Sequence, residues 1–239
     1  MKAKQARLDR FIRRQLNLPQ RDVQLLLARG QVCVDKNVVN NGQMIINEFS
    51  HIVVNDQVLQ ALTPKYVMLN KPKGVVSATK DPQHKTVVDL LGPGDHADLH
   101  IAGRLDFNST GLLLLTNDGR WSRYLASPEN NISKRYRVTV EKPLNEDYVN
   151  AFSEGLFFAY EGITTRPAKL EIINDYEAEI NLTEGRYHQI KRMFGRFQNK
   201  VLALHRLAIG PLALDTNLAE EQHRALSEQE VANMLHHSE

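Results

Sequence analysis

The sequence predicts an α+β protein with two domains: a small N-terminal module of two helices and a small sheet, and a larger domain with a mixed, largely antiparallel sheet and flanking helices. Three observations support this prediction. Residues 1–60 show two helical repeats followed by short strands. Residues 61–65 include a proline and have no periodicity, which predicts a linker. From residue 66 to 239, short strands alternate with helices.

Two helices and a hairpin are predicted in the N-terminal module. Helical spacing over about 7–16 comes from four apolar residues: Leu8, Phe11, Ile12 and Leu16. After a break at 17–19, Val23, Leu26 and Leu27 predict a second helix, which should end near Gly30, a suitable C-cap residue. Residues 31–34 and 38–39 predict a tight hairpin, and 51–54 predict another short strand.

The basic residues gather in this module. Residues 1–36 contain nine Lys or Arg and three Asp, a net charge of +6, whereas the rest of the chain contains 21 basic and 25 acidic residues, a net charge of −4. Such an imbalance is typical of a polyanion-binding surface, although a solvated basic face has the same composition.

The larger domain begins with two predicted strands, at 66–70 and 112–116. The turn at 117–119 closes the second strand, and a short helix is predicted at 120–126. Tyr136, Val138 and Val140 alternate with polar residues, as in a strand with one buried face.

The rest of the larger domain continues the alternation. Asn145 is suited to cap a helix that ends at Gly155. A capping-box spacing of Ser227 and Glu230 predicts a final short helix. The sequence also predicts strands and one helix between these two helices: strands at 168–173, 177–182 and 200–205, and a helix at about 187–197.

The predicted helix over 187–197 has one apolar side. Ile190, Phe194 and Phe197 share that side, and Lys191 borders it. A lysine in this position either extends to water or enters a cleft and pairs with a carboxylate. The opposite side is polar and carries three residues: Gln189, Arg192 and Arg196.

Several classes of protein and site are disfavoured. The longest apolar run spans only 112–115 and no apolar segment follows the basic N-terminus, so we expect no membrane span and no signal peptide, and a cytoplasmic protein. Cys33 is the only cysteine, and its apolar neighbours predict a buried residue. His96 and His100 lack further ligands nearby, so we expect no metal site. No glycine-rich phosphate loop is present.

Asp106 lies in an unusually polar segment, 100–111, that is interrupted by glycines and precedes a predicted buried strand. Glycines permit tight or left-handed backbone, which favours a loop that holds Asp106 at the mouth of a cleft. The residues alone also fit an Asx-turn, or a surface ion pair between Arg104 and Asp106.

This segment, GRLDFNSTGLLLLTNDG, resembles the signature of the pseudouridine synthases, in the group that includes the small-subunit ribosomal enzyme. Similar segments follow in the order found in that family. They are MLNKPKG, KRYRVTV, RPAKLEI, EGRYHQIKRMF and LHRLAIGPL. Among family members the chain resembles most the ribosomal small-subunit pseudouridine synthase A family.

The resemblance implies roles for Asp106, for Tyr136 and for a basic residue of EGRYHQIKRMF. Asp106 is implied to be the nucleophile that cuts the uridine glycosidic bond, and the carbon that it attacks stays open. Tyr136 is implied to stack on the flipped uracil and to assist proton removal, although its position also fits core packing. A basic residue of EGRYHQIKRMF is implied to pair with the nucleophile, and Lys191 is our candidate, ahead of Arg186 and Arg192. Arg104 is expected to contact Asp106 or the nucleotide backbone if it faces the same cleft.

The N-terminal module resembles the S4-like RNA-binding domain, through the segments RLD and ARGQVCVDKNVV. It is implied to present basic side chains to the phosphates of folded RNA. The RNA-binding candidates are Arg7, Arg10, Arg14, Arg21 and Arg29 of this module, together with Lys71, Lys73, Arg186 and Arg192 of the larger domain. The implied partner is small-subunit ribosomal RNA, free or in an assembling particle, with no cofactor and a monomeric enzyme. A synthase for large-subunit or transfer RNA, or a non-catalytic assembly factor, stays open.

Overall fold

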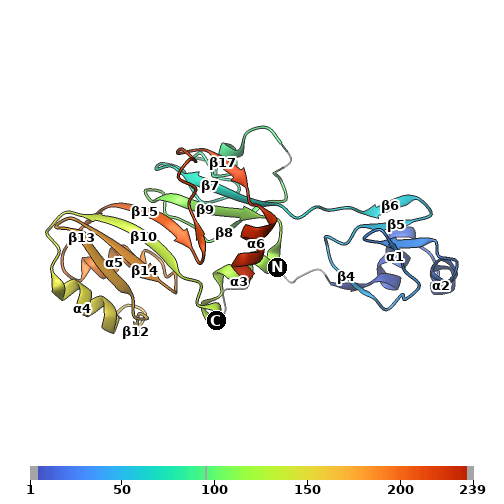
Figure 1. The fold of residues 1–239 in the computed structure, drawn as a ribbon, viewed down its shortest axis with the longest axis horizontal. Coiled ribbons are helices and arrows are strands. Elements are labelled where there is room, and N and C mark those ends of the chain that lie inside the picture. Colours follow the sequence, from blue (N-terminus) through green and yellow to red (C-terminus); the bar gives the residue numbers. More distant parts are fainter. Residues whose placement is uncertain (1–4, 95, 236–239) are drawn as a thin grey trace. The chain divides into compact units, whose positions relative to one another are not determined.

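The computed structural model describes residues 5–94 and 96–235 and divides the chain into two compact units, Met1–Pro64 and Lys65–Glu239. The division falls inside the segment predicted as a linker. Figure 1 shows both units, and each is described here by itself. Within the described residues, no helix is long and apolar enough to cross a membrane.

The N-terminal unit contains the two predicted helices, α1 (Leu8–Leu16) and α2 (Gln20–Ala28). Asn17 ends α1 in a left-handed conformation, with φ of 51°. Four strands form an antiparallel sheet in the order β3-β2-β5-β6: β2 (Val32–Val34), β3 (Asn37–Val38), β5 (Ile52–Val54) and β6 (Gln57–Gln60). The predicted hairpin is therefore confirmed. Two further short strands pair with each other: β1 (Ala6–Arg7) and β4 (Ile45–Ile46).

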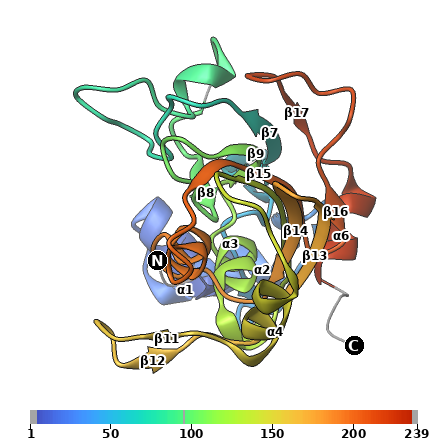
Figure 2. The ribbon, with the colours of Figure 1, turned by 90° about the vertical axis from the view of Figure 1, so that its left-hand side faces the viewer.

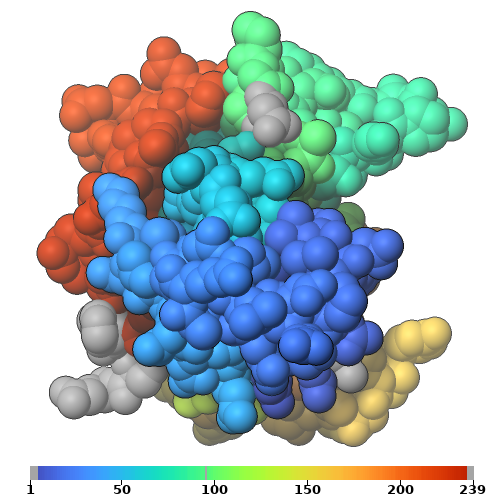
Figure 3. Space-filling model, turned by 90° about the vertical axis from the view of Figure 1, so that its right-hand side faces the viewer, coloured from blue at the N-terminus to red at the C-terminus, as the bar shows by residue number. Residues whose placement is uncertain are grey.

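Apolar residues from both helices and the sheet form one core in this unit. Leu8 and Ile12 of α1 are fully buried, which explains the helical repeat, because only that side of α1 meets the sheet. Cys33 is half-buried, so the prediction of a buried cysteine was wrong: it alternates with the buried Val32 and Val34 on β2. Figure 3 shows the surface of this unit, with α1 and α2 in dark blue.

The C-terminal unit is built on one large sheet. Among the described residues, seven strands follow the order β13-β14-β10-β15-β9-β7-β17, while β16 pairs with β15 and β8 pairs with β9. All neighbours are antiparallel except β9 and β15. The strands are β7 (Tyr66–Lys71), β8 (His100–Ala102), β9 (Thr110–Thr116), β10 (Lys134–Val140), β13 (Lys169–Asn174), β14 (Glu177–Leu182), β15 (Val201–Ile209), β16 (Leu212–Ala213) and β17 (His223–Ala225).

Strand β9 is buried on both faces. Leu112 and Leu114 enter one core together with α3 (Gly119–Ala126) and α6 (Glu228–Leu235), whereas Leu113 and Leu115 enter another. Alternate residues of a strand point to opposite faces, so a strand between two cores has a continuous apolar run. The run at 112–115 has this origin.

The remaining helices are α4 (Glu146–Glu154) and α5 (Gln189–Gly195), which bury aromatic residues against β10, β13 and β14. Two 3₁₀ turns, η1 (Asp89–Leu91) and η2 (Pro128–Asn130), lie in connecting loops. Asn145 caps α4 by accepting a hydrogen bond from the Asp147 backbone N–H, as predicted. The hairpin of β11 (Phe157–Phe158) and β12 (Ile163–Thr164) projects from this unit (Figure 2).

The prediction for the helix over 187–197 was wrong in two respects. The helix begins only at Gln189, because His188 has a left-handed backbone with φ of 48°. Gln189 was placed on the polar side, yet it is 3% exposed. Its amide binds Glu184, which is itself buried, so a polar side chain occupies a position that periodicity assigns to solvent.

Candidate active site

Asp106 lies in the loop between β8 and β9, where glycines make the chain path possible. Gly103 has φ of +93° and Gly111 has φ of +97°. A Cβ on Gly111 would lie 2.4 Å from the backbone oxygen of Arg206 on β15, because β9 and β15 run side by side there. Only glycine fits such a close approach without displacing the backbone. The glycines of the sequence signature therefore fix where the Asp106 loop leaves the sheet.

Lys71 is fully buried, with 0% exposure, beneath the Asp106 loop. Its Nζ donates to the carbonyl oxygens of Ser109 at 2.9 Å, Pro72 at 3.0 Å, Asp106 at 3.2 Å and Phe107 at 3.4 Å. Burial lowers the pKa of Lys71 to about 8, so the group remains largely charged at neutral pH. The prediction that Lys71 contacts RNA is therefore corrected: its ammonium group is enclosed and holds the loop from inside.

Arg206 on β15 holds the same loop from the other end, and sequence reasoning did not identify it. Arg206 is 2% exposed, and its guanidinium donates to the carbonyl oxygens of Gly103 at 2.8 Å, Leu112 at 2.7 Å and Arg104 at 3.4 Å. It also lies 3.5 Å from the Tyr136 hydroxyl. The only sequence signal was its place in the motif LHRLAIGPL. A buried arginine needs acceptors, and here the loop supplies them.

Two side chains of the segment 184–195 reach the Asp106 carboxylate. Lys191 Nζ lies 2.7 Å from Oδ2, and His188 Nε2 lies 3.5 Å from Oδ1. The three side chains are about one third exposed, at 30% for Asp106, 32% for Lys191 and 37% for His188. The Asp106 carboxylate therefore contacts both Lys191 and His188 and is still partly exposed to solvent. His188 was not among the predicted site residues.

A network of buried hydrogen bonds fixes the turn that carries His188. Glu184 is 5% exposed and accepts from Gln189 Nε2 at 2.7 Å, from Arg186 Nε at 3.0 Å and from the Arg166 backbone N–H at 3.0 Å. Gln189 Oε1 accepts from the Arg186 backbone N–H at 3.0 Å. These linked hydrogen bonds hold the backbone on both sides of His188.

Tyr136 lines the same pocket from β10. The pocket therefore brings together Asp106, Tyr136 and Lys191, with the exposed Arg104 on its rim. No ion pair or hydrogen bond joins the Arg104 side chain to Asp106 among the described residues. Apolar side chains complete the pocket: Leu105, Leu182, Ile190 and Leu204. The arrangement offers a planar ligand an aromatic wall and an apolar floor beside the Asp106 carboxylate.

The other predicted residues occupy different places. Arg186 is 42% exposed and lines the cleft, and Lys73 is exposed. Arg192 points away from Asp106: it pairs with Glu161, with Nη1 2.6 Å from Oε1, and covers the Phe158 ring at 3.8 Å. The alternative that Arg192 pairs with Asp106 is therefore wrong, and its charge is already matched by Glu161.

On the N-terminal unit, four of the predicted arginines are exposed: Arg10, Arg14, Arg21 and Arg29. The fifth, Arg7, is half-buried and pairs with the buried Asp9 at 2.6 Å. Its guanidinium is therefore engaged within the unit.

Comparison with known proteins agrees with the geometry. A family model described as RNA pseudouridylate synthase matches residues 65–195. A Pseudomonas aeruginosa protein named ribosomal small subunit pseudouridine synthase A is 48% identical over 95% of this chain and 100% of its own length. An Escherichia coli K12 protein of the same name is 39% identical over 96% of this chain and 100% of its own.

Among solved structures, one titled as a crystal structure of pseudouridylate synthase superposes with a TM-score of 0.70 at 38% identity, over 95% of this chain and 99% of the other. The matched motifs include both the Asp106 loop and the segment with Lys191. From this agreement along almost the whole chain, we conclude that the protein belongs to the RNA pseudouridylate synthase family.

Proposed function

We propose that this protein isomerises a specific uridine of small-subunit ribosomal RNA to pseudouridine, with Asp106 as the nucleophile. The observation that carries the proposal is the ion pair in the cleft, where Lys191 Nζ lies 2.7 Å from Asp106 Oδ2. The substrate follows from the relatives, whose names specify the small ribosomal subunit.

The reaction breaks the bond between ribose C1′ and uracil N1 and forms a bond between C1′ and C5. C5 loses a proton and N1 gains one, so the product is an isomer and no electrons leave the substrate. An ionised carboxylate can attack an electron-poor carbon of the sugar or the ring and later depart. Lys191 Nζ donates a hydrogen bond to Asp106 Oδ2 at 2.7 Å, which orients the carboxylate in the cleft. No cofactor is required for this chemistry.

Tyr136 suits two tasks in this scheme. Its ring is a stacking surface for a flipped uracil, and its phenol is a group that can transfer the C5 proton. The adjacent Arg206 guanidinium, 3.5 Å from the hydroxyl, would hold the phenol in place. Arg104, exposed on the rim, is suited to contact the RNA backbone there.

For the N-terminal unit we propose an S4-like RNA-binding role. Its support is the four exposed arginines on and beside α1 and α2, together with the net charge of the first 36 residues. Such side chains would hold folded RNA through its phosphates, whatever its base sequence. A monomeric, cytoplasmic enzyme acting on free RNA or on an assembling particle goes with this proposal.

The proposal is tested by mapping pseudouridines in ribosomal RNA by carbodiimide modification and primer extension. Cells lacking the gene should lose one pseudouridine of the small-subunit RNA. Wild type should restore it, and Asp106→Asn, which keeps the shape of the side chain but removes its charge, should not.

Each other result has its own meaning. An unchanged map after gene deletion would contradict an enzymatic role and favour a non-catalytic assembly factor. Loss of a site from large-subunit or transfer RNA would contradict only the assigned substrate. Restoration by Asp106→Asn would contradict the assigned nucleophile.

A further inference from the structure

An exposed pair of stacked rings lies beside the candidate nucleophile. Tyr187 stacks on His188 with ring centroids 3.9 Å apart and an interplanar angle of 20°. On its other side, His188 approaches the Asp106 carboxylate, with Nε2 3.5 Å from Oδ1. Tyr187 itself is 77% exposed. The His188 ring thus lies beside Asp106, and the Tyr187 ring stacked on it is exposed to solvent.

The turn that carries these rings is held by hydrogen bonds to its own neighbours. Glu184 and Gln189 hold it through the buried hydrogen bonds already described. Arg192 also donates a hydrogen bond to the Tyr187 carbonyl oxygen at 3.4 Å. His188 is kept in the left-handed region, with φ of 48°. A non-glycine residue in this region costs free energy, and such strain concentrates at functional sites. A fixed ring also loses little entropy when a partner stacks on it.

Exposure alone would not mark Tyr187, since single exposed aromatic residues are common. Tyr160, on the turn of the β11–β12 hairpin, is even more exposed, at 97%, and has no ring partner among the residues that the structure describes. Tyr187 differs because it is stacked, held, and flanked by cations. Arg186 precedes it with 42% exposure, and Lys191 lies one helical turn further along the chain with 32% exposure.

We propose that Tyr187 is a stacking platform for a nucleobase next to the reactive uridine in the RNA. This inference rests on the proposed function. Flipping a uridine into the cleft unstacks its neighbours, and an exposed aromatic ring can replace the lost stacking contact. Arg186, with a side chain 42% exposed, suits a phosphate that links the flipped nucleotide to this neighbour, whereas the ammonium group of Lys191 is held by Asp106. The platform would hold the RNA on one side of the flipped base.

The test combines substitutions in the full-length protein with abasic RNA. An RNA oligonucleotide that contains the target site is prepared unmodified and with either neighbour of the uridine replaced by an abasic nucleotide. Dissociation constants are then measured for wild type, Tyr187→Ala, Tyr187→Phe and Tyr160→Ala. Tyr187→Ala should bind unmodified RNA roughly 5- to 150-fold more weakly, the range expected for one lost base stack. Tyr187→Phe should bind like wild type because it keeps the ring, and so should the matched control Tyr160→Ala.

The abasic RNAs identify the contact. Wild type should lose affinity at one neighbouring position, and Tyr187→Ala should lose nothing further there, because the stacking contact is already gone. Equal abasic losses in both proteins, or wild-type affinity of Tyr187→Ala, would overturn the stacking inference. Turnover of unmodified RNA by wild type is measured alongside. Its absence would overturn the proposed function together with the inference, whereas normal turnover with equal abasic losses would overturn the inference alone.

Discussion

At the scale of single residues, the Asp106 loop depends on two buried cations, Lys71 and Arg206. Both bind backbone carbonyl oxygens and, in the described part of the chain, neither forms an ion pair with the Asp106 carboxylate. Lys71 binds four carbonyl oxygens of its surroundings, and Arg206 binds three others. Sequence reasoning placed Lys71 among the RNA-binding residues, although lysine is rarely buried unless paired and here it is enclosed. It also passed over Arg206, which sits in a strand motif. Whether a cation faces water or carbonyl oxygens is decided by the packing around it.

The buried Lys71 and the exposed Lys73 allow the bracing role of Lys71 to be tested against a neighbouring control. Lys71→Met should lower the free energy of unfolding by roughly 2 kcal/mol, since it leaves buried carbonyl oxygens without a donor. It should also reduce the rate of pseudouridine formation, because the Asp106 loop loses its support. Lys73→Met, at an exposed neighbouring position, should leave stability unchanged. Urea unfolding and single-turnover rates measure both, and equal stability of the two variants would contradict the bracing role.

At the scale of elements, local patterns were sufficient where a helix has one buried side. The helices α1, α2, α4 and α6 lie where apolar spacing and caps predicted them. Of the two-residue strands, only β3 was predicted, from its hairpin with β2, since so few residues contain no period. The segment 100–102, predicted as loop, forms β8 because it pairs with β9. A short strand that forms because it pairs with a neighbouring strand has little periodicity in its own sequence.

The close approach of β9 and β15 at Gly111 gives a sharp prediction. Gly111→Ala should lower the free energy of unfolding by roughly 3–5 kcal/mol, because its Cβ meets the backbone of Arg206 and its φ of +97° disfavours side chains. Gly162→Ala is the control, with a similar φ of +66° but no atom within 4 Å of the added Cβ. That change should cost only about 1–2 kcal/mol. Thermal or urea unfolding distinguishes them, and similar losses would argue against the backbone contact.

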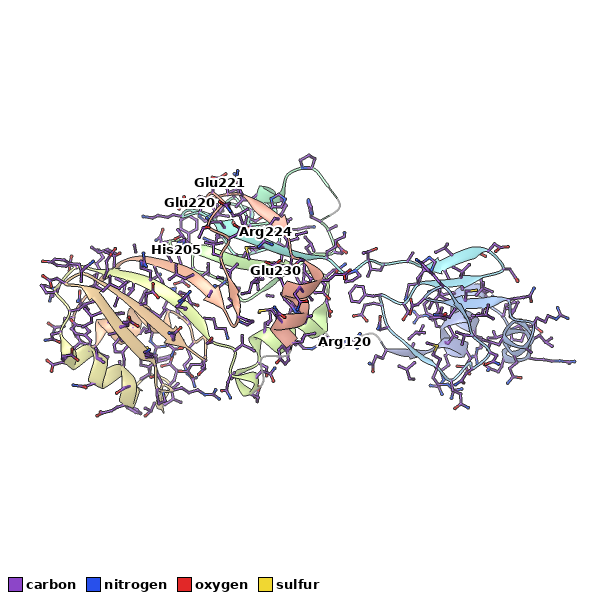
Figure 4. All side chains as sticks on the ribbon, in the orientation of Figure 1. Arg120, His205, Glu220, Glu221, Arg224 and Glu230 are labelled. Carbon is purple, nitrogen blue, oxygen red and sulfur yellow. The ribbon has the colours of Figure 1, made fainter. Side chains whose placement is uncertain are left out.

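The C-terminal helix α6 gives a prediction of pH dependence. Arg224 of β17 donates to Glu230 of α6 at 2.7 and 2.9 Å (Figure 4). These bonds lower the pKa of Glu230 to about 2, from its ordinary value of 4.5. A carboxylate with a lowered pKa stabilises the fold above its unfolded-state value, and that stability is lost as pH falls from about 4.5 towards 2.

Glu230→Gln should therefore be less stable than wild type at pH 7, by roughly 1 kcal/mol because the pair is partly exposed. The difference should shrink as pH falls below 4.5. Glu228→Gln, at an exposed position of the same helix turn, should show little effect at any pH. Urea unfolding at several pH values tests this, and a difference as large at pH 3 as at pH 7 would exclude the ion pair as its source.

At the scale of the whole molecule, the two units have separate cores, so we expect each to fold by itself. The core of the N-terminal unit contains only residues of that unit, and the clusters of the larger unit contain none of them. Removal of residues 1–60 should leave a folded catalytic unit. RNA affinity should fall, and its dependence on salt should become shallower, because fewer phosphates are neutralised. Binding titrations at several salt concentrations measure this, and an unchanged salt slope would contradict an RNA-binding role for the N-terminal unit.

The sequence by itself determined the two-unit organisation, the main helices, the buried strand at 112–116 and the set of motifs that places the chain in its family. These depend on local periodicity, turn chemistry and ordered motifs, which are properties of neighbouring residues. The tertiary structure alone decided that Lys71 and Arg206 are enclosed, that Arg192 turns to Glu161, and that His188 joins Lys191 at Asp106. These contacts join strands and turns that are far apart in the sequence. Local sequence patterns do not predict which of these segments lie together.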